Sequence, residues 1–174
     1  MSTAVLLFHP NYEASKVNRR LLDELAKQNP AGVDVRDEYA LYPDFKVDVE
    51  AEHAFIEQHD HIVLQFPFYW YSSPALLKQW EDAILTPGWA YAGGNALDGK
   101  TLQLAVSTGS PASRYQKDGE YKRTMNELLS PFELMAFRVD LTWREPFLVQ
   151  NTSAITDEEL DQAAKEYVKA IAEE

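Results

Sequence analysis

The sequence of 174 residues contains no cysteine, and this absence removes several kinds of chemistry at once. Disulfide bonds, thiol redox centres and cysteine-bound zinc or iron–sulfur clusters are all excluded. The four histidines, His9, His53, His59 and His61, show no metal-ligand spacing, and we place His53 and His59 on a solvated helix face or its end. If this chain does redox work, an organic cofactor must carry the electrons.

Basic residues are also scarce, because 16 lysines and arginines stand against 28 acidic residues and give a formal net charge of −12. An acidic chain is repelled by phosphate backbones and anionic lipids, which disfavours nucleic acid and direct membrane binding. No apolar run is long enough to span a bilayer. Residues 1–8 lack a basic region and a small-residue cleavage site, so they are typical of a strand rather than a signal peptide. By elimination, the sequence predicts a cytoplasmic protein.

Glycine-rich motifs are missing too, since the chain has only 7 glycines. Neither the phosphate-binding P-loop nor the Gly-x-Gly-x-x-Gly dinucleotide fingerprint occurs. The Gly-x-Ser-x-Gly motif of serine hydrolases is absent as well. These absences exclude the commonest nucleotide-binding and hydrolase motifs, so a site must be sought in other loops.

What the chain does contain is a regular alternation of apolar strand-like runs and amphipathic helical segments. The expected strands cover residues 3–8, 33–37, 61–66, 101–107 and 137–141. The expected helices cover residues 16–28, 50–58, 76–84, 122–136 and 156–172. Pro131 should interrupt or kink its helix, and Thr156 with Glu159 has the spacing of a capping box. The alternation predicts one α/β domain over residues 1–174, with a doubly wound five-stranded parallel sheet and helices on both faces.

A doubly wound sheet binds its ligand outside the carboxyl ends of its strands. That rule selects three loops, residues 9–15, 67–73 and 107–115. The first loop enters a helix whose start could hold a phosphate on Ser15, Asn18 and free backbone amides. Taken alone, however, it is better interpreted as an ordinary capped helix.

The second loop carries four consecutive aromatic residues, at positions 68–71. Such a run cannot all enter the core, so a flat aromatic ligand could stack there. A dimer interface rich in aromatics is an equally good interpretation. The third loop contains Gly109 among small hydroxyl residues, which lets backbone approach a ligand closely, although taken alone it is better interpreted as a plain polar loop. Residues 88–94 form either a lid over a pocket or a surface loop anchored by Trp89.

Short motifs across nearly the whole chain, each weak alone, are specific in their order and spacing. They are His9-Pro10 with Ser15 and Asn18, Leu41-Tyr-Pro-Asp-Phe45, Gln65-Phe-Pro67, Trp70-Tyr71, Pro74-Ala-Leu-Leu-Lys78, Trp80, Gly88-Trp-Ala-Tyr91 and Ser107-Thr-Gly109. Together they resemble the NAD(P)H:quinone oxidoreductase (DT-diaphorase-like) family. The match is best with its small bacterial branch, the ancillary subunits of glutathione-gated potassium efflux systems.

The resemblance implies a flavodoxin-like fold and a homodimer with a flavin site shared across the interface. The cofactor-binding residues that it implies are His9, Ser15, Lys16, Val17, Asn18, Pro67, Phe68, Tyr69, Trp70, Ser107, Thr108, Gly109 and Ser110. The implied substrate-binding residues are Tyr71, Tyr115 and, from the partner subunit, Tyr91, and the implied catalytic residues are Tyr115 and Tyr121. Two positions depart from the family pattern: Ser110 replaces a glycine, and Tyr121, or Glu120 if the loop shifts, replaces a histidine.

The implied activity is two-electron, ping-pong transfer of hydride from NAD(P)H through a flavin to a quinone-like acceptor. FMN is the expected cofactor because the short C-terminus leaves little chain to hold an adenosine, and FAD is the alternative. A second interpretation is a regulatory subunit of a potassium efflux transporter, which would bring the chain to the inner membrane. An electron-carrier flavodoxin is the third.

Overall fold

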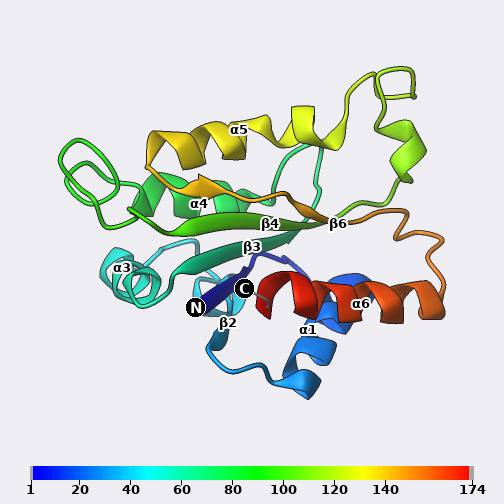
Figure 1. Cartoon of the computed structure of the whole chain (residues 1–174), viewed down its shortest axis with the longest axis horizontal. Helices are drawn as coiled ribbons and strands as arrows, with labels where there is room; N and C mark the ends of the chain where they lie inside the picture. Colours follow the sequence, from blue (N-terminus) through cyan, green and yellow to red (C-terminus); the bar gives the residue numbers. More distant parts are fainter. Residues whose placement is uncertain (1, 173–174) are drawn as a thin grey trace.

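A parallel β-sheet runs through the centre of the molecule, with helices on both of its faces (Figure 1). The computed structural model describes residues 2–172. The strands are β1 (Thr3–Leu7), β2 (Val33–Asp37), β3 (His61–Pro67), β4 (Thr101–Ser107), β5 (Thr142–Trp143) and β6 (Phe147–Val149). Their order is β2-β1-β3-β4-β5, with β6 also paired to β4, and all pairs are parallel. The predicted doubly wound α/β fold is confirmed, with the last strand of the path split into two.

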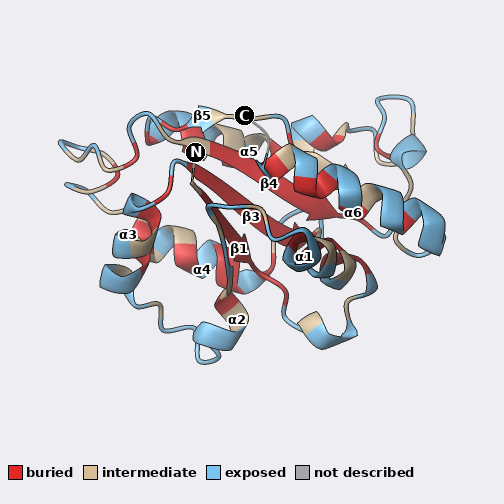
Figure 2. Cartoon of the chain, turned by 60° about the horizontal axis from the view of Figure 1, so that its bottom comes forward, coloured by how far each residue is buried: buried red, intermediate tan, exposed pale blue. Residues whose placement is uncertain are grey.

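Two helical layers cover the sheet. Helices α1 (Lys16–Gln28) and α6 (Asp157–Ala172) pack on one face, while α3 (Val49–Glu57), α4 (Ala75–Ile84) and α5 (Met125–Arg138) pack on the other. The shorter elements are α2 (Glu38–Leu41) and two 3-10 turns, η1 (Tyr12–Ala14) and η2 (Ala112–Arg114). Figure 2 shows the central strands buried between helices whose outer faces are exposed. Because β1 and β3 are buried on both faces, they need the continuous apolar runs seen in the sequence.

The predicted strand at residues 137–141 is wrong. Helix α5 continues to Arg138, and the chain pairs with β4 only from Thr142 onward. Val139 and Leu141 are buried at the end of the helix rather than in a sheet. A short apolar run has no clear periodicity, so it could not separate the two outcomes.

Pro131 lies inside α5 without ending it, so the predicted interruption is wrong, and the alternative of a kink stays a prediction. A proline removes the amide that would bond the carbonyl four residues earlier. That carbonyl belongs to Glu127, and the Ser130 hydroxyl donates a hydrogen bond to it at 2.9 Å. A side-chain donor one residue before the proline therefore replaces the lost backbone bond.

The prediction of solvated histidines is wrong for His59, which lies just after α3, while His53 on α3 is half-buried. His59 is buried and bonds the Phe55 carbonyl and the Asp34 carboxylate, at 2.8 and 2.9 Å. His53 stacks on Trp89, with ring centroids 3.6 Å apart.

The predicted capping box of α6 is confirmed, since Thr156 and Glu159 exchange hydrogen bonds of 2.9 and 3.2 Å. Within residues 2–172, none of the helices has the length and apolarity that crossing a membrane requires.

Candidate active site

The three loops selected from the sequence meet in one cleft of about 270 Å³ at the carboxyl ends of β1, β3 and β4. Its lining consists of His9, Ser15, Lys16, Val17, Asn18, Pro67, Phe68, Tyr69, Ser107, Gly109 and Thr152. Ten of these eleven positions are among the cofactor-binding residues predicted from sequence. Thr152 was missed, because it follows β6 and reaches the cleft only when that strand pairs with β4. Strand order reverses between β1 and β3, so the cleft lies at the switch point of the sheet.

A buried polar network holds the start of α1 against the sheet. The Asn18 amide group donates to the Ser107 hydroxyl at 3.0 Å, and Gln65 donates to the Asn18 side-chain oxygen at 3.2 Å. Tyr167, wholly buried on α6, donates to Gln65 at 2.7 Å. Asn18 is therefore fixed by contacts from two strands, β3 and β4, and α6 supports it through Gln65.

The helix start offers hydrogen-bond donors to an anion. Ser15 caps α1 by accepting from the Asn18 amide at 3.1 Å. The amides of Lys16 and Val17, at the first two helical positions, have no acceptor within the helix. The positive end of the helix dipole adds to their attraction for a phosphate. Lys16 and Val17 both line the cleft, so their two amides are donors that fit a phosphate group there.

The basic residues of α1 already have carboxylate partners. Lys16 Nζ lies 3.0 Å from Asp157 on α6, and Arg20 pairs with Asp161. These two cations are therefore paired with carboxylates of α6 without any bound anion. His9 is buried at the cleft wall, where burial lowers the pKa of its imidazole. Its Nδ1 accepts a hydrogen bond from the Asn11 amide at 3.1 Å, so the neutral ring carries its proton on Nε2.

The aromatic loop turns sharply at the cleft. Tyr69 and Ser72 exchange two backbone hydrogen bonds of 3.0 Å, and the intervening Trp70 and Tyr71 have φ values of 47° and 63°. Positive φ costs energy in bulky residues and is often found at functional sites. The result is a Trp70 side chain that is 93% exposed, which confirms that the four aromatics do not all enter the core.

The third loop is held by a backbone bond to β6 and by a bond within the loop itself. Thr108 donates its amide to the Val149 carbonyl at 2.9 Å, and its hydroxyl donates to the Ser110 carbonyl at 2.9 Å. A Cβ added to Gly109 would meet only the Ser153 hydroxyl, at 3.4 Å. The protein itself therefore has room for a side chain at Gly109, which leaves that space free for a ligand.

Three predicted tyrosines gather around Phe68 at the edge of the cleft. Tyr115 lies 6.2 Å from Phe68 and 4.9 Å from Tyr121 between ring centroids, and Tyr71 lies 6.4 Å from Phe68. The Tyr121 hydroxyl is 2.8 Å from that of Ser110. Trp70, Thr108 and Ser110 flank the cleft without lining it.

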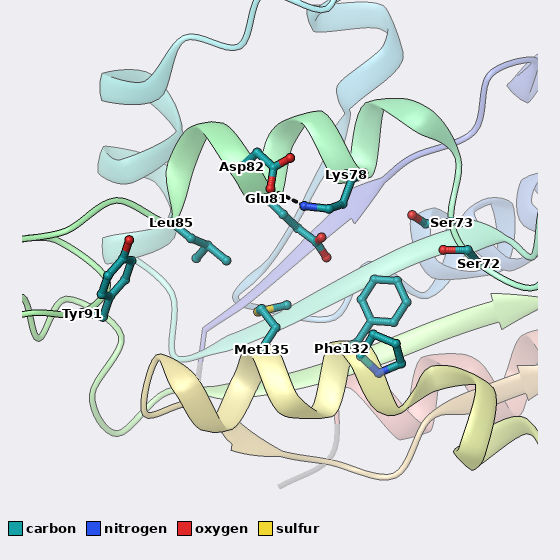
Figure 3. Close-up of a pocket in the computed structure, with 10 residues that line it drawn as sticks. Ser72, Ser73, Lys78, Glu81, Asp82, Leu85, Tyr91, Phe132 and Met135 are labelled. Carbon is teal, nitrogen blue, oxygen red and sulfur yellow. Dashed lines mark hydrogen bonds and ion pairs between the residues drawn. The ribbon is translucent and has the colours of Figure 1, made fainter.

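Tyr91 does not reach this cleft. It lines a separate groove of about 540 Å³ between α4 and α5, with Ser72 and Ser73 at one end and Tyr91 at the other (Figure 3). Its loop lies at the opposite end of the sheet from the cleft. Trp89 anchors the loop by donating to Glu57 at 2.7 Å, which supports the interpretation as a surface loop.

Fold and cleft together define a doubly wound α/β protein whose switch-point cleft lies between a helix start and an aromatic loop. The chain belongs to the flavodoxin-like fold family, whose model matches residues 1–171. The uncharacterized NAD(P)H oxidoreductase YrkL of Bacillus subtilis (strain 168) is 44% identical, over 98% of this chain and 99% of that protein. The glutathione-regulated potassium-efflux system ancillary protein KefG of Pectobacterium atrosepticum is 41% identical, over 94% of this chain and 88% of that protein.

Solved structures with similar folds carry several names. The general stress protein 14 of Treponema denticola, in complex with FMN, is 41% identical with a TM-score of 0.93, covering 98% of both chains. An NADPH-quinone reductase from P. pentosaceus is 29% identical with a TM-score of 0.91, covering 100% of this chain and 99% of that one. A thermophilic tryptophan halogenase enzyme from Streptomycin violaceusniger is 42% identical with a TM-score of 0.94, covering 98% and 99%.

Proposed function

We propose that this chain is an FMN-dependent NAD(P)H oxidoreductase that passes two electrons to a quinone-like acceptor. The observation that carries the proposal is the cleft itself, where free helix-start amides and an exposed aromatic loop lie side by side at the switch point. An anion donor set beside a stacking platform fits a phosphate joined to a flat ring. The FMN complex of the Treponema relative and the NAD(P)H and quinone names of two others support the choice of cofactor and substrates.

Different residues of the cleft would hold the phosphate and the ring of FMN. The amides of Lys16 and Val17, with Ser15 and Asn18, would bind the phosphate, and neutral His9 would donate from Nε2. Residues 67–70 and 107–110 would hold the ring between them. When bound, FMN supplies the two-electron chemistry, and the nicotinamide and the acceptor would visit the same face in turn. Tyr71 and Tyr115 would form the walls of that visiting site.

We also infer a homodimer. Leu134 and Phe137 on α5 are 66% and 58% exposed, so this helix carries apolar surface that a second copy would bury. Tyr91 lies at the end of the groove remote from its own cleft. A two-fold axis across the groove would carry each Tyr91 toward the partner's cleft, as an isologous interface requires.

Mixing two defective variants tests the shared site. We expect Tyr91→Ala to raise the KM for the acceptor about tenfold by removing one aromatic wall. A heterodimer of Tyr91→Ala with Ser15→Asp, which is designed to exclude FMN, should recover a normal acceptor KM at one of its two sites. Tyr91 of the intact loop then serves the cleft of the other subunit. Separately tagged subunits purified as heterodimers would show no recovery if Tyr91 acted within its own chain.

The oxidoreductase proposal is tested by turnover of the FMN-loaded protein. We expect NADPH or NADH to be consumed one for one with a soluble quinone, giving hydroquinone. Protein that binds FMN stoichiometrically but oxidises neither nicotinamide would contradict the proposal. A protein that failed to bind FMN at all would contradict the assignment of the cleft.

A second candidate is the regulatory subunit of a potassium efflux transporter. KefG relatives, 41% identical over 94% of this chain, favour it, and such a partner would bring the chain to the inner membrane. The exposed Trp70 and the apolar face of α5 are surfaces that a transporter domain could contact. Binding to the purified cytosolic domain of such a transporter, with little quinone turnover in isolation, would favour this candidate. Robust turnover by the isolated protein would weaken it.

A further inference from the structure

A further groove, the β2 groove, lies at the outer edge of the sheet, where helix α1 faces strand β2 (Figure 1). Its volume is about 460 Å³, and its lining consists of Leu7, Tyr12, Leu22, Asp23, Leu25, Ala26, Asn29, Pro30, Val33, Val35 and Asp37. It shares no lining residue with the proposed FMN cleft. The β2 groove is therefore a separate surface, to which the proposed oxidoreductase function assigns no role.

Strand β2 presents one unpaired edge along this groove. In the part of the chain that the structure describes, it pairs with β1 and with no other strand. The Thr3 amide donates to the Gly32 carbonyl at 2.7 Å, so the backbone groups of every second residue from Gly32 onward face β1. Those of Val33, Val35 and Asp37 therefore face outward. Val35, at the centre of the strand, is 46% exposed, so this edge is open to another strand.

The side chains of β2 divide between the two faces of the sheet. Arg36 pairs with the buried Glu52 on α3, which places it on the face away from the groove. Val33, Val35 and Asp37 lie on the groove face, opposite α1. A strand added at this edge would continue the same alternation, so every second one of its side chains would enter the β2 groove.

An acidic end distinguishes this groove from an ordinary apolar depression. Burial raises the pKa of the Tyr12 phenol, and the charges of Asp23 and Asp37 add to the rise, so both carboxylates lie near this ring. Neither aspartate has an ion-pair partner within residues 2–172. The lining contains no lysine or arginine, and most of its remaining residues are apolar. A side chain with an apolar stem and a cationic head matches this combination.

We propose that the edge of β2 and the β2 groove bind an extended segment of a partner protein that carries lysine or arginine and apolar residues at alternate positions. The segment would add to β2 as a strand, with backbone hydrogen bonds to Val33 and Val35. Its apolar side chains would pack on Leu25, and its cationic side chains would reach Asp23 and Asp37. A second copy of this chain fits poorly, because two edges that both carry unpaired carboxylates repel each other.

The blocked peptide Thr-Lys-Thr-Val-Thr-Lys-Thr is a suitable probe, because in an extended strand its two lysines and its valine lie on one face. Amide chemical shifts of the full chain, followed by NMR as the peptide is added, measure the binding. We expect the shifts of Val33 and Val35 to move and those of the FMN cleft to stay. Absence of binding at about 1 mM peptide would overturn the proposal.

Neutral variants test the two carboxylates. We expect Asp23→Asn and Asp37→Asn each to weaken peptide binding about fivefold, the effect of one exposed ion pair. Asparagine keeps the hydrogen bond that Asp37 accepts from the Ala40 amide at 3.1 Å. Glu24→Gln is the matched control, because Glu24 follows Asp23 on α1, pairs with Lys27 and lies outside the groove. It removes the same charge and should leave the affinity unchanged. Equal losses in all three variants would mean that the overall charge attracts the peptide, and would overturn the site.

Methylated peptides test the strand addition itself. The amides of an added strand point alternately toward and away from β2, so N-methylation of one alternate set should abolish binding while the other set has little effect. Equal effects of the two sets would overturn strand addition, and equally tight binding of hexylamine would assign the groove to a small amine instead. Val35→Lys should lower peptide affinity at least about tenfold by charge repulsion in the groove. A homodimer that dissociates in Val35→Lys would assign the edge to a second copy and overturn the proposal.

Discussion

Replacing Ser15 by aspartate is expected to lower the affinity for FMN at least about 100-fold while keeping the protein folded. Aspartate caps helices as well as serine does, so the bond from the Asn18 amide is retained. Its carboxylate would stand where the phosphate is proposed to bind. Two like charges about 5 Å apart repel by about 3 kcal/mol at an effective dielectric constant of about 20, which corresponds to about 100-fold in Kd.

Quenching of FMN fluorescence measures this effect directly. Thr124→Asp is the matched control, because Thr124 caps α5, on the opposite face of the sheet, by accepting from the Glu127 amide at 3.2 Å. It adds the same charge to the same kind of cap and should leave FMN binding unchanged. Unaltered affinity in Ser15→Asp would show that the start of α1 does not hold the phosphate.

Replacing Glu38 by glutamine is expected to stabilise the protein by about 3–5 kcal/mol at pH 8 and by almost nothing below pH 4.5. Glu38 is fully buried, and Arg36 Nε lies 3.5 Å from its carboxylate. Arg36 also pairs with the buried Glu52, which accepts bonds from Tyr42 at 2.5 Å and Trp80 at 2.8 Å. Arg36 is thus the shared partner of two buried carboxylates, and Glu52 also accepts hydrogen bonds from Tyr42 and Trp80.

The direction of the pH effect follows from the pKa of Glu38. Burial, and then the charge of Glu52, raise this pKa from about 4.5 to about 8. The folded state therefore binds the proton more tightly than the unfolded state. The contribution of protonated Glu38 to the free energy of unfolding is therefore fully present below pH 4.5. It falls as pH rises toward 8, because the unfolded chain then loses this proton readily while the buried carboxyl must keep it or ionise inside the protein. A glutamine side chain does not titrate and avoids this loss.

Urea unfolding at pH 4.5, 6 and 8 measures the difference between wild type and Glu38→Gln. Glu50→Gln, an exposed position on α3, is the control and should show no pH-dependent difference. A constant offset between Glu38→Gln and wild type at all three pH values would mean that Glu38 does not change its protonation on unfolding.

Most of the cleft was predictable because it depends on local signals. Apolar runs gave β1, β3 and β4, and a parallel sheet places the loops after these strands at one edge. The cap at Ser15 and the exposed aromatic run at residues 68–71 could also be predicted, because both depend on residues close together in the sequence. What the sequence could not show is which of these loops touch at the level of atoms, such as the bond between Ser110 and Tyr121.

The remaining features depend on long-range packing. The end of α5 and the split into β5 and β6 are decided by pairing with β4, some forty residues earlier in the chain. Thr152 reaches the cleft through that pairing. Likewise, Arg36, Glu38 and Glu52 look like ordinary surface charges in the sequence, and only the packing of α2, α3 and α4 buries the two acids.

The central claim is that the three-loop cleft binds a flavin that takes hydride from a nicotinamide. The most direct test is the visible absorption spectrum of the FMN-loaded protein during anaerobic addition of NADPH. We expect the flavin bands to bleach in a single two-electron step with one equivalent of NADPH. Flavin that remains bound and unbleached, or a chain that takes up no FMN or FAD at all, would contradict it.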